Sequence, residues 1–146
     1  EYMFVFSKGS PKTFNPIKKP SIHAGKKVSG RDRQPNGEFK ERIDKIYPDE
    51  APLPNIWFYS PGYMKSSKDP LAFEHPATFP EKLASDHIIS WSNPGDIVFD
   101  PFLGSGTVAL MAERMNRKWL GCEISSEYVD IAQRRIDAEK SQLKMF

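Results

Sequence analysis

Cysteine and long apolar runs are the scarcest features of this 146-residue sequence. Cys122 is the only cysteine, which excludes an internal disulfide and fits a reducing cytoplasm. No apolar run approaches the ~20 residues that a membrane-spanning helix needs, so no membrane association is expected. The histidines are widely separated and, with one cysteine, give no zinc-binding spacing, so no metal is expected.

The sequence does not open with a methionine, and its first segment is not expected to be a signal peptide. The chain begins at Glu1 and continues directly into an apolar run, residues 2–6, without a basic stretch before it. We expect residues 2–6 to form a strand, and the chain to be a fragment or a processed product. A hydrophobic fraction of 38% and a charged fraction of 27% predict a globular domain.

Positive charge is concentrated in the first third of the chain. Residues 8–45 hold 11 Lys and Arg against 4 Asp and Glu, whereas residues 46–146 hold 10 against 14. Such a distribution is expected when one part of a protein faces a polyanion. Residues 11–45 are also rich in Pro and Gly and show no hydrophobic period, so we expect an extended segment without a core.

Helices and strands are predicted to alternate from residue 78 onward. Thr78 and Glu81 have capping-box spacing before a helical stripe from Leu83 to Trp91. The apolar segments 97–99 and 119–122 predict buried strands, each followed by a helix. The inward residues of these helices are predicted to be Val108, Met111, Ala112 and Met115 in the first, and Tyr128, Ile131, Ala132 and Ile136 in the second, capped by Ser125 or Ser126. This alternation predicts an α/β fold with a parallel sheet.

Two acidic residues stand at the C-terminal ends of the predicted strands, where ligands of open α/β sheets bind. Asp100 ends the first strand and Glu123 follows the second, 23 residues later, close to the ~20 of nucleoside-binding units. Between them, Gly104 and Gly106 precede a helix, where glycine allows close approach of a ligand and leaves amides free at the positive helix end. Because a carboxylate can accept ribose hydroxyls, we expect a site for a nucleoside with a polar tail.

The glycine pattern discriminates between nucleosides. A pyrophosphate-binding loop has the pattern G-x-G-x-x-G, and here the third glycine is missing. The carboxylate of Asp100 would repel phosphate but attract the ammonium group of a methionine tail. S-adenosylmethionine is therefore favoured over NAD, and a dinucleotide-binding oxidoreductase domain stays as an alternative.

Several consecutive segments resemble one known family. Asp100–Thr107 is similar to the cofactor motif of DNA methyltransferases that modify the exocyclic amine of adenine (N6) or cytosine (N4). His75–Glu81 resembles the segment before that motif in the permuted, beta-type arrangement, and Gly121–Tyr128 resembles the motif after it. Residues 1–8 resemble the strand that precedes the target-recognition region of the family.

The resemblance implies a Rossmann-like S-adenosylmethionine-dependent methyltransferase fold, partial and in permuted motif order, with an inserted loop-rich target-recognition region. It implies a core strand in residues 1–11, a basic target-recognition region in 12–74, and the cofactor-binding part of the core in 75–146. The implied cofactor contacts are Asp100, Pro101, Phe102, Gly104, Ser105, Gly106, Thr107, Glu123 and Ile124, with His75, Thr78 and Phe79 closing from the other side.

The implied substrate is double-stranded DNA in a prokaryotic cytoplasm, with the gene either prokaryotic or carried by a phage. The side chains expected to contact phosphates are Lys18, Lys19, Lys26, Lys27, Arg31 and Arg33. The further partners left open are a second copy of the chain and an upstream part of the same enzyme.

The catalytic motif of the family does not occur in the sequence. That motif is an Asp, Asn or Ser followed by Pro-Pro and an aromatic residue, and it holds the flipped base. The nearest similar segment, Ser60–Tyr63, has Gly in place of the second Pro. We therefore expect the motif upstream of Glu1 and no catalytic residue in this chain. A DNA-binding remnant without catalysis is the alternative, and the target base stays open.

Overall fold

The computed structural model describes residues 2–41 and 45–143, which fold as two units. The core unit comprises residues 1–15 and 58–146, and the hairpin unit comprises Pro16–Trp57. Among the described residues, no helix combines the length and the apolar character that crossing a membrane requires.

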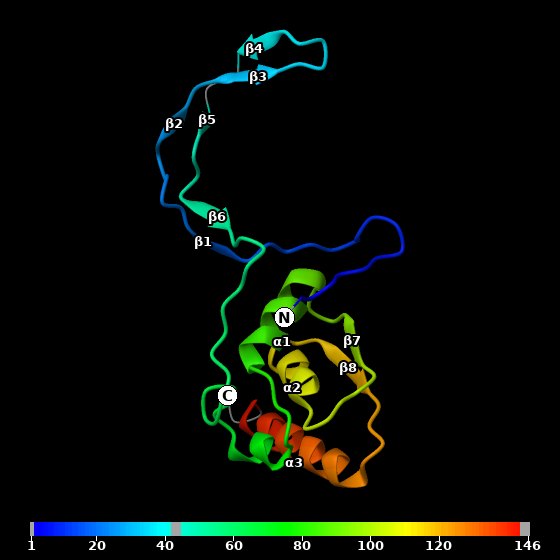
Figure 1. The fold of residues 1–146 in the computed structure, drawn as a ribbon. Coiled ribbons are helices and arrows are strands. Elements are labelled where there is room, and N and C mark those ends of the chain that lie inside the picture. The colour runs from blue at the N-terminus through cyan, green and yellow to red at the C-terminus, as the bar shows by residue number, and fades with distance from the viewer. Residues whose placement is uncertain (1, 42–44, 144–146) are drawn as a thin grey trace. The chain divides into compact units, whose positions relative to one another are not determined.

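Helices and strands alternate in the core unit, as the sequence predicts (Figure 1). Its elements are the 3-10 helix η1 (Pro70–Glu74), α1 (Glu81–Trp91), β7 (Ile97–Asp100), α2 (Thr107–Arg114), β8 (Lys118–Gly121) and α3 (Ser126–Leu143). Strands β7 and β8 pair in parallel, in the register that places Ile97 beside Lys118 and Asp100 beside Gly121. The predicted mixed α/β architecture with parallel strands is therefore confirmed.

Helix α2 lies at the centre of the core unit. It packs against both strands and against α1 and α3 (Figure 1). The buried cluster that joins α1 to α2 consists of Ala84, Ile88, Leu110, Met111 and Ala112, with Val98, Val108, Met115 and Trp119 packed around it. These residues include most of the predicted inward stripes of the two helices, because an apolar face at helical spacing is most stable against another element.

Helix α3 also follows its predicted pattern. Ile131, Ala132 and Ile136 are buried. The hydroxyl of Ser125 accepts a hydrogen bond from the amide of Tyr128 at 3.4 Å, as expected for a residue that caps the helix.

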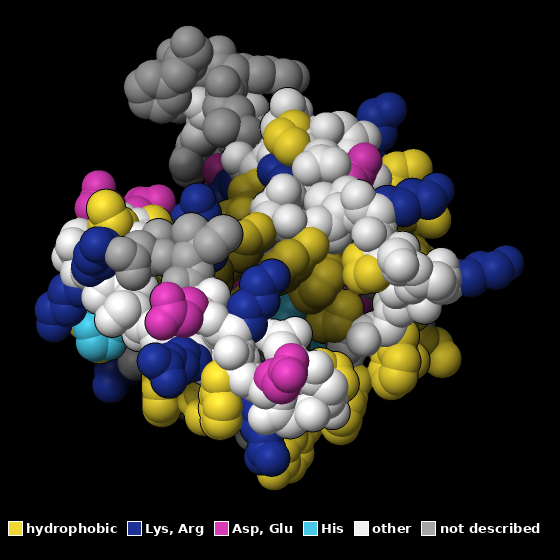
Figure 2. Space-filling view, turned by 90° about the horizontal axis from the view of Figure 1, so that it is seen from above, with side chains coloured by type: hydrophobic (Ala, Val, Ile, Leu, Met, Phe, Trp, Pro, Cys, Tyr) yellow, Lys and Arg dark blue, Asp and Glu magenta, His cyan; other side chains and the backbone are white. Residues whose placement is uncertain are grey.

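The prediction of fully buried strands is wrong. Successive side chains of a strand point to opposite faces, and only the face with Val98 and Trp119 packs on the helical core. On the other face, Ile97, Phe99 and Leu120 are 70%, 56% and 60% exposed, and hydrophobic side chains are widespread on the surface (Figure 2). Cys122, predicted to lie in a buried strand, is also exposed, because it lies beyond the end of β8.

The predicted capping box at the start of α1 is also wrong. The helix begins at Glu81 with Pro80 as its cap residue, and no side chain in the described part of the chain caps it. Glu81 is therefore the first helical residue instead of the third, too early for its carboxylate to reach back as a capping box requires. That carboxylate instead accepts hydrogen bonds from Ser67, Arg114 and Arg135.

Residues 2–6 form no strand, contrary to expectation. Tyr2, Phe4 and Phe6 are 92%, 75% and 89% exposed. A strand needs hydrogen bonds to a neighbouring strand, and none of the described residues pairs with this segment.

The described residues of the hairpin unit form three antiparallel strand pairs. They are β1 (Lys18–Pro20) with β6 (Glu50–Pro52), β2 (Lys27–Val28) with β5 (Lys45–Ile46), and β3 (Arg31–Arg33) with β4 (Phe39–Glu41). The first strand of the unit pairs with the last, the second with the fifth and the third with the fourth, so the unit is one long hairpin. At the tip, the Gly37 amide donates to the Gln34 carbonyl at 2.9 Å in a turn with Pro35 at its favoured position.

Residues 11–45 were expected to be extended and to lack a core, and the pairing of these extended strands was not predicted. Main-chain hydrogen bonds hold them, and such bonds need no hydrophobic period. None of the described residues in Pro16–Trp57 is buried, as expected for a segment without a core. The unit is also narrower than the predicted region 12–74, since residues 12–15 and 58–74 belong to the core unit.

Candidate functional site

The two acidic strand ends lie side by side in the core unit. The parallel register places Asp100 next to Gly121, two residues before Glu123. Two backbone hydrogen bonds continue the pairing beyond the strands, from the Cys122 amide to the Asp100 carbonyl at 3.0 Å and from the Leu103 amide to the Cys122 carbonyl at 2.8 Å. The predicted convergence of the two strand ends is thus confirmed.

Glu123 is the electrostatic centre of this region. Its Oε2 accepts from the Gly104 amide at 2.8 Å, and its Oε1 accepts from the amides of Ile124 and Ser125 at 2.8 and 3.0 Å. The amides of Ser125 and Gly104 contribute most to a pKa of this carboxyl below its ordinary value, so it is ionised at neutral pH. A carboxylate accepts about four hydrogen bonds, which leaves one position for a ligand hydroxyl.

A pocket of about 260 Å³ opens beside this carboxylate. Eight predicted cofactor residues line it, namely His75, Thr78, Phe79, Phe102, Gly104, Ser105, Thr107 and Glu123. We call it the tip pocket. Its volume is below the roughly 300–1,000 Å³ of typical ligand sites, so it suits part of a nucleoside.

Three lining residues were missed by the sequence analysis: Ala77, Leu103 and Tyr128. All three fall within the segments that carry the family resemblance, which was the available signal. Tyr128 was assigned to the core on its helical spacing alone.

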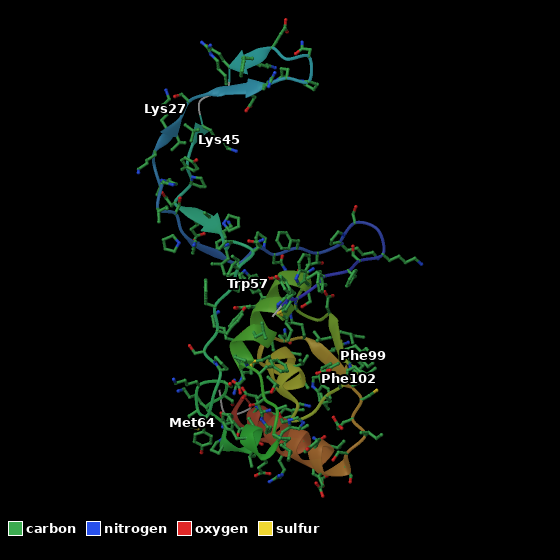
Figure 3. All side chains as sticks on the ribbon, viewed as in Figure 1. Lys27, Lys45, Trp57, Met64, Phe99 and Phe102 are labelled. Atoms are coloured by element: carbon green, nitrogen blue, oxygen red, sulfur yellow. The ribbon has the colours of Figure 1, made fainter. Side chains whose placement is uncertain are left out.

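Four predicted contacts lie outside the lining of the tip pocket: Asp100, Pro101, Gly106 and Ile124. Asp100 accepts a hydrogen bond from the Phe102 amide at 3.0 Å and so shapes the loop after β7. Ile124 is fully exposed, and Phe102 is 87% exposed on the outer side of the strand pair, near Phe99 (Figure 3).

The two glycines of the loop have different roles. Both have positive φ, of +52° at Gly104 and +79° at Gly106. A Cβ on Gly104 would lie 3.4 Å from Nε2 of His75, at the pocket, whereas a Cβ on Gly106 would lie 2.8 Å from the Cβ of Ala132 in α3. Gly106 therefore permits the packing of α2 on α3.

The expectation that these glycine amides are free for a ligand is wrong. The Gly104 amide donates to Glu123, and the Gly106 amide donates to the Leu103 carbonyl at 2.9 Å.

His75 both stabilises a turn and lines the tip pocket. Its Nδ1 lies 3.0 Å from the Ala77 carbonyl oxygen and 3.1 Å from the Ala77 amide, so it closes a tight turn. Its ring also lines the tip pocket and meets the ring of Tyr128 edge-on, with 4.2 Å between the centroids.

A buried arginine behind the tip pocket was not foreseen. Arg135 of α3 has a fully buried side chain that donates to Asp69, Glu81 and Ser105. The only sequence signal is that a charged residue lies between Ala132 and Ile136 on the inward face of a helix, where apolar residues are expected.

The basic residues predicted to contact DNA are all exposed and all lie in the hairpin unit, namely Lys18 and Lys19 in β1, Lys26 and Lys27 at β2, and Arg31 and Arg33 in β3. Lys27 and Lys45 come from the facing strands β2 and β5 (Figure 3). Neighbouring residues of a strand point to opposite faces, so Lys18 and Lys19 of β1 are split between the two faces. Arg31 and Arg33 share a face, and Arg31 lies 3.7 Å from Glu41 across the pair.

Comparison with known proteins connects this geometry to a family. A family model described as DNA methylase matches residues 1–134. The chain belongs to this DNA methylase family. The match includes the strand ends and the residues of the tip pocket, and it favours the DNA methylase family over a dinucleotide-binding oxidoreductase domain.

Two bacterial relatives illustrate the similarity. The orphan methyltransferase M.BamHII of Bacillus amyloliquefaciens is 52% identical over 140 residues, which cover 93% of this chain and 53% of that protein. The type II methyltransferase M.HpaI of Haemophilus parainfluenzae is 40% identical over 86 residues, 58% of this chain and 26% of that protein. The chain thus spans about half the length of M.BamHII and a smaller part of M.HpaI.

Solved structures of methyltransferases also align with parts of the chain. The PvuII DNA methyltransferase (cytosine-N4-specific) is 46% identical over 42% of this chain and 22% of its own, with a TM-score of 0.41. The M1.HpyAVI–SAM complex is 38% identical over 44% of this chain and 31% of its own, with a TM-score of 0.43.

Proposed function

We propose that this chain is the cofactor-binding and target-recognising part of a DNA methyltransferase. The enzyme would transfer a methyl group from S-adenosylmethionine to the exocyclic amine of adenine or cytosine in double-stranded DNA, in the bacterial cytoplasm. Membership of the DNA methylase family supports this proposal. We further propose the Rossmann-like fold in permuted motif order, with the target-recognition region inserted at residues 12–74.

The observation that carries the proposal is the arrangement of the tip pocket. The ionised carboxylate of Glu123 accepts a hydrogen bond from the Gly104 amide of the loop, and apolar residues that include Phe79 line the same pocket. Because Glu123 has one acceptor position left, it can hold one ribose hydroxyl, and a second requires the release of one amide. Phe79, Phe102 and Leu103 offer the apolar surface that an adenine ring needs.

Asp100 would hold the far end of the cofactor. One of its carboxylate oxygens accepts from the Phe102 amide, and the other is available for the ammonium group of the methionine tail. Asp100 stands at the strand end next to the pocket, without lining it. The bound cofactor supplies the activated methyl group, and this chain's residues bind and orient it.

The hairpin unit would supply the contact with DNA. A two-stranded antiparallel ribbon fits the major groove, and exposed lysines and arginines can neutralise phosphates. The catalytic side chains would come from outside these 146 residues, because the chain has no Pro-Pro-aromatic motif. An upstream part of the same protein is the proposed source, and a second copy of the chain is the alternative.

Calorimetry on the full-length protein tests the cofactor site. S-adenosylhomocysteine, the demethylated product, should bind with micromolar affinity, and Glu123→Ala and Asp100→Ala should each weaken binding. NADH should give no fluorescence enhancement. Absence of heat with both adenosyl nucleosides, on protein shown to be folded, would overturn the proposal.

Methyl transfer from tritiated S-adenosylmethionine to bacteriophage DNA tests the activity. Digestion of the product to nucleosides would then identify N6-methyladenine or N4-methylcytosine. Binding of cofactor and DNA without transfer of label would support the non-catalytic alternative.

A further inference from the structure

Arg135 connects three segments that are far apart in the sequence. Its Nε donates to Oδ2 of Asp69 at 2.7 Å, its Nη2 to Oε1 of Glu81 at 3.1 Å, and its Nη1 to the carbonyl oxygen of Ser105 at 2.6 Å. Nη1 also lies 3.3 Å from the hydroxyls of Ser105 and Thr107. Its side chain is 0% exposed, while the side chains of Asp69 and Glu81 are 27% and 16% exposed, so the bonds to Ser105 and Thr107 are the most sheltered from water.

The three contact points frame the tip pocket. Asp69 caps η1 by accepting from the Leu71 amide at 3.0 Å, and Glu81 begins α1. They are therefore the two ends of residues 69–81, which we call the wall segment and which carry His75, Thr78 and Phe79 into the pocket lining. Ser105 belongs to the opposite side, the glycine loop of residues 101–106.

We propose that Arg135 is a positioning residue of the cofactor site, which fixes the distance between the wall segment and the glycine loop. The inference rests on the proposed function, because it assigns a nucleoside to the pocket between these two walls. Arg135 does not line the pocket itself, so it acts on a ligand only through the residues that it holds.

The chemistry of the side chain explains why arginine is needed. A guanidinium is a planar fork with five donors, which can reach acceptors in three directions at once. The ammonium of a lysine is a single point charge, and cannot span the same acceptors. The charge is compensated by two carboxylates, and Glu81 has a second partner in Arg114 at 3.0 Å. A lysine at this position therefore keeps the charge balance but loses the fork.

The test compares two adjacent arginines in the full-length protein. Arg135→Lys should raise the Kd for S-adenosylhomocysteine at least about tenfold, the factor expected when a charge-assisted hydrogen bond is lost. Asp69→Asn, which lies outside the pocket lining, should raise it in the same direction. The control is Arg134→Lys, whose side chain is 53% exposed and pairs at 2.7 Å with Glu74, itself 45% exposed and part of the wall segment. Because an exposed ion pair contributes little, the Kd of this variant should change by less than about twofold.

A double-mutant cycle separates positioning from a general loss of stability. His75→Ala should weaken binding less in the Arg135→Lys background than in the unaltered protein, because the wall is already displaced. In the absence of ligand, amide hydrogen exchange should quicken in residues 75–79 and 103–107 of Arg135→Lys, with no change in the hairpin unit.

The outcomes distinguish the two proposals. If the unaltered protein does not bind S-adenosylhomocysteine, the proposed function fails and this inference fails with it. If the unaltered protein binds and Arg135→Lys has the same Kd and the same exchange rates, only the inference fails. The inference would also be overturned if the effects of Arg135→Lys and His75→Ala on the Kd were additive and the loss of affinity in Arg135→Lys followed the fraction of unfolded protein.

Discussion

The core unit and the hairpin unit are stabilised in different ways. The core unit buries an apolar cluster around α2 and an arginine with its carboxylate partners, whereas none of the described residues of the hairpin unit is buried. A site that orients a small cofactor needs fixed walls, and these come from packing. A segment that meets a large partner can instead keep its side chains exposed and its strands held by main-chain bonds.

The largest expected effect tests this difference in packing. Leu110→Ala removes a side chain that is 2% exposed at the centre of the core unit, and should lower the free energy of unfolding by about 2–5 kcal/mol. The matched change Phe39→Ala, at a residue of β4 that is 65% exposed, should cost below about 0.5 kcal/mol. Urea unfolding measures both. Equal losses would contradict the contrast between the two units.

A pair of glycines sharpens the comparison. Gly106→Ala and Gly37→Ala both place a side chain at positive φ, of +79° and +86°, which costs about 1–2 kcal/mol in either unit. Only at Gly106 would the new Cβ clash, 2.8 Å from that of Ala132, while at Gly37 nothing lies within 4 Å. Overpacking should therefore add about 1–3 kcal/mol to the loss for Gly106→Ala alone. Thermal unfolding measures the Tm of both variants. A similar fall in Tm for the two would refute this prediction.

The hairpin unit should matter for DNA and not for the cofactor. The double change Arg31→Ala and Arg33→Ala, on one face of β3, should lower DNA affinity about tenfold. The slope of log affinity against log salt concentration should become shallower by roughly 0.9 for each lost phosphate contact. Fluorescence anisotropy with labelled duplex at several salt concentrations measures it. The Kd for S-adenosylhomocysteine should not change.

The control for the DNA experiment is Lys140→Ala, which removes a lysine from α3 in the core unit. This variant should leave the slope of log DNA affinity against log salt concentration unaltered. A slope that falls equally in both variants would show that the electrostatic contact with DNA is not specific to the hairpin unit.

The smallest expected effect concerns pH. Hydrogen bonds from the amides of Ser125 and Gly104 lower the pKa of Glu123 from its ordinary value of 4.5. A lowered carboxyl pKa stabilises the folded state fully above the ordinary value, and this contribution is lost as the pH falls through the lowered one. Glu123→Gln should therefore flatten the fall in Tm between neutral and acidic pH. Parallel profiles of the two proteins would contradict the assigned bonds.

Local sequence patterns predicted most of the core unit. The stripes of α1 and α2, the capped start of α3 and the parallel strands depend on neighbours within one or two turns or within one βαβ unit. The same reasoning failed at Ile97, Phe99 and Cys122, because an apolar residue in a strand does not reveal whether a second layer covers it. It also did not predict the strand pairs of the hairpin unit, because main-chain hydrogen bonds leave little trace in the pattern of side chains.

By itself, the sequence determined the order of helices and strands and the motif at the strand ends, since both follow from residues close together in the chain. Only the tertiary structure decided how that site is held. Arg135 lies 66, 54 and 30 residues from Asp69, Glu81 and Ser105, and no local pattern records that they meet. The physical reason is that a buried charge is stable only where folding brings its partners to it.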